Sequence, residues 1–268
     1  MMEFLRVENA GFYYQPKKYI FRDIDFTLNG GEALCIIGAN GCGKTTLLDC
    51  ALGLTPLVDG KVFVGGRLLA DMKPADIAKE MAYIPQSHKT TFAYTVLDVV
   101  TMGRTSALGP FSAPGREERE IAMCALEEVG MTDFADRTYT TLSGGELQLV
   151  IIARAIAQEA KVLVMDEPTS HLDFFHEMKV MEIIAELVMD KGMSVLMATH
   201  FLNQAYFLEN IGVKTKVALM KDGGFSSEGV PSVMLTTENL EETFNIATEI
   251  VQDSRHTRKY ILPLGIRR

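Results

Sequence analysis

The stretch that most restricts how this chain can fold is the loop GANGCGKTT, from Gly38 to Thr46. It follows the apolar run LCII, precedes the helix-compatible run LLDCALG, and matches G-x-x-x-x-G-K-[ST] at every required position. Glycines let successive backbone N–H groups turn toward one anion, and a helix that starts at the end of the loop adds its positive dipole end. The sequence therefore predicts a strand–loop–helix unit that binds a triphosphate.

Single positions of this loop have separate expected roles. Lys44 is expected to reach the β- and γ-phosphate oxygens, and the Thr45 hydroxyl is expected to take one coordination position on Mg²⁺. Cys42 is either a thiol whose alkylation would block nucleotide or an inert filler. The alternative for the whole loop is a glycine-rich turn with a buried or ion-paired lysine. The predicted nucleotide-binding residues here are Gly38, Asn40, Gly41, Cys42, Gly43, Lys44, Thr45 and Thr46.

Strand and helix patterns alternate along the rest of the chain. The runs EFLRVENAGFYY and YIFRDIDFTL have alternating apolar positions and predict an antiparallel β element before the loop. The continuous apolar runs in KVLVMDEP and SVLMATH suit parallel strands that are covered on both faces. Two hairpins are predicted, with turns at Asp59–Gly60 and Asp222–Gly223. We therefore predict an α/β fold: a P-loop NTPase core with a mainly parallel sheet, an antiparallel β subdomain and a helical insertion.

The helical insertion runs from about Ser87 to Ala160, where REEREIAMCALEEVGM shows helical periodicity. We expect a single domain over residues 1–268. Within it, residues 1–86 and 161–240 are the expected nucleotide-binding core, 87–160 the helical subdomain and 241–268 a C-terminal tail.

Composition excludes some classes of protein. The sequence has no uninterrupted run of about 18 apolar residues, so no membrane span is predicted. The stretch MMEFLRVENA has no signal-peptide pattern, so a cytoplasmic protein is expected. The four cysteines show no C-x-x-C spacing, which predicts reduced thiols. A net charge of −9 gives no general footprint for nucleic acid or anionic lipid, so no nucleic acid partner is expected.

A second set of polar residues ends the run VLVMDEP. Adjacent side chains on an extended chain point in opposite directions, so Asp166 can face Mg²⁺ while Glu167 faces another point of the site. Glu167 is the candidate for polarising the water that attacks the γ-phosphate. The alternative is an acidic strand end that faces solvent.

The motif LSGGE precedes a predicted helix of about four turns, LQLVIIARAIAQE. Ser143 and Glu146 have the spacing of a capping box, while the backbone of Gly144 and Gly145 offers a second anion site. One nucleotide cannot fill both anion sites within one compact protomer. Two copies packed head to tail would solve this, because the Ser143–Gly145 loop of one copy could cap the γ-phosphate held by the Lys44 loop of the other.

These motifs together resemble those of the ATP-binding cassette (ABC) ATPases, over nearly the whole chain. GANGCGKTT matches the Walker A motif of that family, LSGGE its signature motif and VLVMDEP its Walker B motif. The resemblance implies that Gln86 touches Mg²⁺ and takes part in catalysis, and that His200 is the switch histidine near the γ-phosphate. It also implies that Tyr14 stacks on adenine, with Tyr13 as an alternative. The implied D-loop, at the dimer interface, contains Ser170, Leu172 and Asp173.

Two departures from the family pattern concern Leu147, where many members have Arg or Gln, and Phe201, where Asp is common. Neither removes a phosphate or metal ligand. A metal site formed by His171, His176 and Glu177 is not expected, because the two histidines lack the i, i+4 spacing of a helical zinc motif.

Short segments such as TVLDVVTMGR resemble the corresponding sequences of the ATPases that serve iron-siderophore, haem, cobalamin and molybdate importers. The resemblance implies an ATP-hydrolysing motor subunit, with ATP and Mg²⁺ as cofactors and a second copy of the chain as partner. It further implies permease subunits that dock at about Gln86 to Arg104, a substrate-binding protein, and a location on the inner face of the membrane. The alternatives are a non-transport cassette acting as a soluble regulator or repair factor, and a P-loop kinase, for which LSGGE and His200 would have no use.

Overall fold

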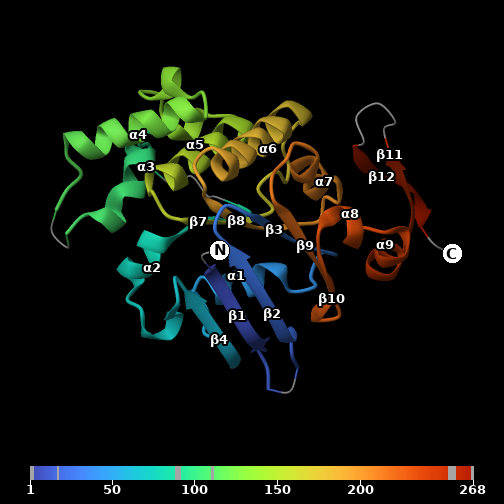
Figure 1. The fold of residues 1–268 in the computed structure, drawn as a ribbon. Coiled ribbons are helices and arrows are strands. Elements are labelled where there is room, and N and C mark those ends of the chain that lie inside the picture. The colour runs from blue at the N-terminus through green and yellow to red at the C-terminus, as the bar shows by residue number, and fades with distance from the viewer. Residues whose placement is uncertain (1–2, 17, 88–91, 110–111, 253–257, 267–268) are drawn as a thin grey trace. The chain divides into compact units, whose positions relative to one another are not determined.

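The computed structural model describes residues 3–16, 18–87, 92–109, 112–252 and 258–266. They belong to two compact units: the first combines Met1–Asp71 with Ala185–Arg268, and the second is Met72–Ile184. Figure 1 labels most of the helices and strands. Parallel strands, an antiparallel sheet and a largely helical segment confirm the predicted α/β class.

An antiparallel sheet with strand order β2-β1-β4-β5 opens the first unit. Every second or third residue of β2 is buried, which is why this stretch forms a half-buried strand. The strands are β1 (Glu3–Phe12), β2 (Phe21–Asn29), β4 (Asp59–Val64) and β5 (Arg67–Leu68).

The predicted turn at Asp59–Gly60 is wrong, because both residues belong to strand β4, which pairs with β1. A Cβ on Gly60, whose φ is +87°, would overlap the backbone carbonyl oxygens of Glu8 and Asn9. Close backbone approach at an irregular strand pair is therefore what this glycine provides. The β4–β5 turn lies at Gly65 and Gly66, with φ values of +54° and +76°.

Parallel strands form the centre of the first unit. Strand β3 (Ala33–Gly38) pairs in parallel with β8 (Ser194–Thr199) on one side and with β9 (Thr215–Lys221) on the other. All residues of β3 and β8 are buried, as expected for strands covered on both faces. Strand β10 (Gly224–Gly229) returns antiparallel to β9, which confirms the predicted turn at Asp222–Gly223.

A buried carboxylate ties the start of β3 to β9. Glu32 is fully buried, and its oxygens lie 2.8 Å from Lys214 Nζ and 3.1 Å from Lys216 Nζ. Asn29 adds two more hydrogen bonds, from its backbone and its side-chain nitrogen. Burial raises the pKa of Glu32, but the hydrogen bonds from Lys214, Asn29 and Lys216 outweigh it and leave that pKa below its usual value.

The C-terminal hairpin was not anticipated from the sequence. Strand β11 (Ile246–Gln252) pairs with β12 (Lys259–Ile266). Two asparagine side chains on helix α7 (Asn203–Asn210) pair with the backbone of β12 as a neighbouring strand would: Asn203 with Ile261 at 2.7 and 3.0 Å, and Asn210 with Lys259 at 2.9 and 3.2 Å. These amide pairs hold the hairpin on the helix. The other helices of this unit are α1 (Lys44–Ala51), α8 (Pro231–Met234) and α9 (Thr237–Phe244), with a 3₁₀ turn at Leu69–Asp71.

The second unit contains the parallel strand pair β6 (Met81–Ile84) and β7 (Val162–Asp166) together with most of the helices. Its segment 87–160 holds three α-helices and no strand among its described residues; the subdomain boundaries themselves stay a prediction. The helices are α2 (Pro74–Glu80), α3 (Val96–Thr101), α4 (Arg116–Glu128), α5 (Gly144–Ala157) and α6 (Phe174–Met189, which continues into the first unit), with 3₁₀ turns at Met102–Ala107, Thr132–Phe134 and Tyr139–Thr141.

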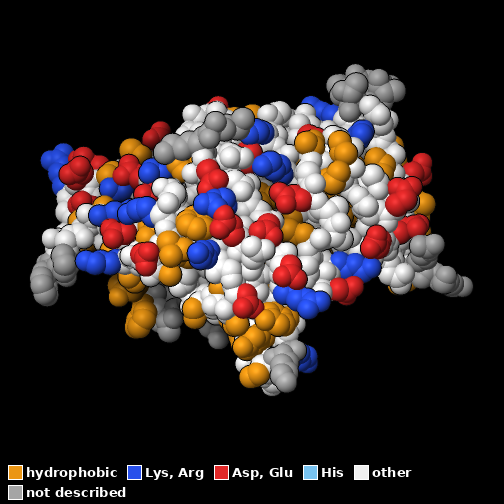
Figure 2. Space-filling model, turned by 60° about the horizontal axis from the view of Figure 1, so that its bottom comes forward, with side chains coloured by type: hydrophobic (Ala, Val, Ile, Leu, Met, Phe, Trp, Pro, Cys, Tyr) orange, Lys and Arg blue, Asp and Glu red, His pale blue; other side chains and the backbone are white. Residues whose placement is uncertain are grey.

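The surface mixes charges of both signs: on the face in view in Figure 2, Lys and Arg side chains are interspersed with Asp and Glu. In the part of the chain that the structure describes, no helix is long and apolar enough to cross a membrane.

Candidate nucleotide-binding site

The phosphate loop leaves strand β3 at Gly38 and enters helix α1 at Lys44. Gly41 and Gly43 have φ values of +80° and +109°, which L side chains rarely adopt. Gly43 is the N-cap of α1 and supplies no side-chain cap, so the first N–H groups of the helix have no capping side chain. The side chain of Lys44 is buried, and its Nζ donates to the carbonyl oxygens of Gly38 (2.8 Å) and Ala39 (3.2 Å). The amine is thus held over its own loop.

His200 lies at the same sheet edge as this loop. Strands β3 and β8 pair in parallel with Ile37 opposite Thr199, so Gly38 and His200 both follow directly at the carboxyl ends of neighbouring strands. This is where ligands bind in open parallel sheets. The His200 ring packs against the Phe201 ring, with 4.1 Å between the centroids and an angle of 35° between the ring planes.

The structure distinguishes the two tyrosines proposed for adenine. Tyr14 is 68% exposed, and its hydroxyl lies 3.5 Å from the Thr46 hydroxyl in the first turn of α1. The ring of Tyr13 instead packs edge-on against Tyr19, whose hydroxyl donates to Asp59 at 2.6 Å. An exposed aromatic face beside the phosphate loop is suited to stack on a base, so the geometry favours Tyr14.

In the second unit, strands β6 and β7 bring two predicted catalytic residues together. Ile84 lies opposite Met165, so Gln86 and Glu167 stand at matching positions two residues beyond. Gln86 Nε2 donates to Glu167 Oε2 at 3.0 Å. Glu167 is 7% exposed, and its backbone φ is +48°, a left-handed conformation that is uncommon for residues other than glycine. Such outliers concentrate at functional sites.

The donors proposed for Mg²⁺ are all oxygens, which suits this hard cation. They are the Thr45 hydroxyl, the Asp166 carboxylate and the amide oxygen of Gln86. Because Gln86 uses its nitrogen to bond Glu167, its oxygen remains for other contacts. Among the described residues no group of three or more His, Cys, Asp and Glu could hold a metal, so a site of the histidine-rich kind is absent there.

The signature segment forms the predicted capping box at the start of α5. Ser143 Oγ accepts from the Glu146 N–H at 3.4 Å, and the Glu146 carboxylate accepts from both the N–H and the hydroxyl of Ser143 at 2.8 Å. These bonds, the backbone one foremost, lower the pKa of Glu146. Gly144 and Gly145 form the first turn of the helix, where unpaired N–H groups favour an anion.

The segment Ser170–Asp173 lies between β7 and α6. Its start is tied back by the Ser170 N–H, which donates to the Glu167 carbonyl at 3.0 Å. Its end caps α6, because Asp173 accepts from the backbone and the ring of His176. The His176 backbone bond is the largest cause of a lowered pKa for Asp173. The sequence analysis considered His176 only as part of a metal site that it did not expect; the signal for its contact with Asp173 was its place three residues after an N-cap aspartate.

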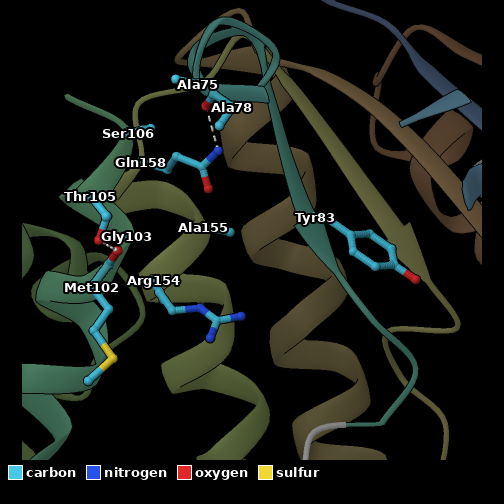
Figure 3. Close-up of a pocket in the computed structure, with 10 residues that line it drawn as sticks. All are labelled: Ala75, Ala78, Tyr83, Met102, Gly103, Thr105, Ser106, Arg154, Ala155 and Gln158. Atoms are coloured by element: carbon cyan, nitrogen blue, oxygen red, sulfur yellow. Dashed lines mark hydrogen bonds between the residues drawn. The ribbon is translucent and has the colours of Figure 1, made fainter. Parts of the chain in front are cut away.

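A cavity of about 430 Å³ opens in the second unit. Ala75, Ala78 and Met102 give it apolar walls, and the Arg154 side chain extends into it from α5 (Figure 3). Arg154 has no hydrogen-bonding or carboxylate partner among the residues that the structure describes. At the rim, Gln158 Nε2 donates to the carbonyl oxygens of Ala78 and Met81 at 2.6 and 2.9 Å. Met102 and Gly103 fall within the range predicted for permease docking; the other lining residues do not.

Comparison with known proteins assigns the chain to a family, since residues 21–170, more than half of its length, match the ABC transporter family. The chain belongs to the ABC transporter family. The matched residues include the phosphate loop, the capping box and the DE pair, which have the sequence patterns of the Walker A, signature and Walker B motifs.

Relatives of this ABC cassette match over nearly their full length. The molybdate import ATP-binding protein MolC of Haemophilus influenzae is 37% identical over 92% of this chain and 90% of its own. A solved structure assigned to the metal-chelate type of ABC transporter, in an inward-facing conformation, is 36% identical with a TM-score of 0.85 and covers 98% of both chains. A dimeric bacterial ABC transporter cassette is 25% identical with a TM-score of 0.73, over 85% of this chain and 98% of its own.

The predicted site residues are thus distributed over the two units. Tyr14, the Walker A loop and His200 lie in the first unit; Gln86, the signature motif, Walker B and the D-loop lie in the second. Within each unit the structure brings its share together, and the roles of these residues toward nucleotide stay predictions.

Proposed function

We propose that this ABC cassette ATPase is the motor subunit of an importer for a metal chelate or a metal oxyanion. Two comparisons support the cargo class: the relative MolC is named for molybdate import, and the structurally similar transporter is assigned to the metal-chelate type. Iron-siderophore, haem and cobalamin are the chelates that the sequence resemblance indicated.

Hydrolysis of ATP is assigned to residues at the carboxyl ends of parallel strands. Tyr14 stacks on adenine, Lys44 binds the β- and γ-phosphates, and His200 donates to a γ-phosphate oxygen. Glu167 polarises the attacking water and takes its proton. The observation that supports this assignment best is the strand register that pairs the Walker A loop with His200.

Mg²⁺, when bound by Thr45, Gln86 and Asp166, would neutralise charge that develops on the β- and γ-phosphates. This chain contributes orientation. The hydrogen bond from Gln86 directs the Glu167 carboxylate, and the neighbouring strands fix where both residues emerge.

ATP is proposed to act between two copies of the chain. The amide groups of Gly144 and Gly145 in one copy would cap the γ-phosphate held by Lys44 in the other, with Ser170 and Asp173 at the interface. A dimeric cassette among similar structures supports this arrangement. Because ATP would contact both copies only in the closed dimer, ATP binding stabilises the closed dimer. Hydrolysis removes the γ-phosphate contacts and lets the dimer open.

The closing motion is proposed to act on a polytopic permease at the inner face of the membrane, with a substrate-binding protein on the far side. The cavity that holds Met102 and Arg154 is the proposed permease contact, since Met side chains adapt to a partner and the guanidinium of Arg154 can take a carboxylate or carbonyl. A soluble regulator or repair factor is the alternative, and no observation specifically favours it.

The variant Glu167→Gln tests the catalytic assignment, because Gln keeps the shape and can still accept from Gln86 but cannot take a proton. We expect ATP binding to persist while kcat falls by about 10²- to 10⁴-fold. The matched control is Glu182→Gln, an exposed carboxylate on α6. A Glu167→Gln variant that hydrolyses ATP at the wild-type rate would remove Glu167 from the base role.

A further inference from the structure

The side chain of His176 makes a hydrogen bond that is not needed to cap the start of helix α6. Its backbone N–H donates to Asp173 Oδ1 at 2.9 Å, which alone caps the helix. Its ring Nδ1 donates to Asp173 Oδ2 at 2.8 Å, because a carboxylate can only accept. The second bond adds nothing to the cap. What it does is fix the orientation of an imidazole ring that is only 20% exposed.

The fixed ring lies against the signature motif. A Cβ placed on Gly145 would overlap Cγ and Cδ2 of His176 and lie 2.6 Å from its Nδ1. Gly145 has no side chain with which to pack, so the ring of His176 covers it instead. The two residues are 31 positions apart in sequence, yet the contact lies wholly within one compact unit. The ring also forms a T-shaped pair with Phe175, at 5.3 Å between centroids.

The position of the signature loop around Gly145 determines whether its backbone can bind an anion. Backbone N–H groups stabilise a phosphate only when they sit at hydrogen-bond distance and point at it, and a small displacement loses most of that effect. The capping box fixes Ser143 to Glu146 but does not reach Gly145. The His176 ring supplies the missing support from the D-loop side.

We propose that His176 is a positioning residue that holds the signature loop, Leu142–Glu146, in place against the D-loop, Ser170–Asp173, of the same protomer. Asp173 orients the ring, the ring supports Gly145, and the N–H groups of the loop then face the ATP held by the second protomer. This inference rests on the proposed function, in which two copies share the nucleotide.

The test compares His176→Ala with His176→Asn, both in the Glu167→Gln background, which is expected to accumulate the ATP-bound dimer because it binds ATP without hydrolysing it. Asn is the conservative choice because its Nδ2, Cγ and Oδ1 can occupy the positions of Nδ1, Cγ and Cδ2, the three ring atoms nearest Gly145. The readout is the dimer dissociation constant at saturating Mg-ATP, by light scattering. ATP affinity of the dilute monomer is measured beside it, with Glu182→Ala as control.

We expect His176→Ala to raise the dimer dissociation constant at least about tenfold, since a hydrogen bond to a charged acceptor and its packing are lost at each of two sites. Monomer ATP affinity should stay within about twofold, and His176→Asn should resemble the parent, because Walker A is not touched. An unchanged constant in His176→Ala overturns the proposal. So does a His176→Asn variant as weak as the alanine variant.

Failure of the proposed function looks different, because Glu167→Gln alone would then stay monomeric with ATP. The hydrolysis rate of His176→Ala in an otherwise wild-type chain is a second readout that does not depend on isolating the dimer. A kcat at least about tenfold lower with unchanged ATP affinity supports positioning by His176, whereas an unchanged kcat overturns it.

Discussion

Replacing Gln86 by Leu tests whether the strand pair β6–β7 orients the catalytic carboxylate. Leu has a similar volume but no amide, so the 3.0 Å bond from Gln86 Nε2 to Glu167 Oε2 is lost while packing changes little. Glu167 would then sample orientations that do not face the attacking water. Binding of ATP itself should persist, because Gln86 is not in the Walker A loop.

The expected size of the effect follows from the kind of bond. A hydrogen bond to a charged acceptor contributes about 1.5–3 kcal/mol, which corresponds to a fall in kcat of about 10- to 150-fold if the bond is needed for the reactive orientation. Glu167 is only 7% exposed, so water replaces the lost donor poorly and the effect should lie in this range.

The assay is steady-state hydrolysis of ATP across a titration of Mg²⁺, with Ser87→Ala as control because Ser87 is the exposed neighbouring residue. The titration separates the two proposed roles of Gln86. If the only loss were a metal ligand, kcat would recover at high Mg²⁺. We expect a deficit that persists at saturating Mg²⁺. A Gln86→Leu enzyme within about twofold of wild type there would refute the orienting role.

Three further outcomes are expected. Lys44→Ala should weaken ATP binding in calorimetry because the phosphate cation is lost; unchanged affinity would contradict the Walker A assignment. Tyr14→Ala should weaken ATP and ADP binding by about 1–3 kcal/mol, the usual range for base stacking, with Tyr13→Ala much closer to wild type; equal effects would remove Tyr14 from the adenine site. Glu32→Gln should lower the free energy of urea unfolding at pH 7. Burial raises the pKa of Glu32, but its hydrogen bonds outweigh burial and leave the folded-state pKa below the unfolded value of about 4.3. The carboxylate therefore stabilises the fold fully above the unfolded-state pKa, and this stabilisation is lost as pH falls through the folded-state pKa. A difference in unfolding free energy between wild type and Glu32→Gln that does not shrink in acid would contradict this reasoning.

Much of the site was readable from the sequence because its elements are local. A glycine-rich loop between an apolar strand and a helix, and an acidic pair after an apolar strand, each need only a few consecutive residues to be recognised. The alternation of strands and helices then predicts an α/β fold with a parallel sheet. The capping box of Ser143 and Glu146 was predicted for the same reason, since both partners lie in one turn.

What the sequence did not reveal depends on pairing between distant residues. The Asp59–Gly60 dipeptide has the composition of a hairpin turn, but pairing of β4 with β1 overrides that preference and moves the turn to Gly65–Gly66. The C-terminal hairpin is held by hydrogen bonds from the side-chain amides of Asn203 and Asn210, which no local sequence pattern predicts. The contact between His176 and Gly145 is likewise visible only once the first turns of α5 and α6 are placed in one unit.

The claim at the centre of this account is that one ATP is shared between Lys44 of one protomer and the signature motif of another. Mixing two inactive variants tests it directly. Lys44→Ala removes the phosphate cation, and Ser143→Asp keeps an N-cap acceptor for α5 but repels the γ-phosphate. A mixed dimer contains one site in which both motifs are intact, so the account predicts that hydrolysis absent from each variant alone returns on mixing. A mixture as inactive as its components, with both variants folded, would contradict the shared site.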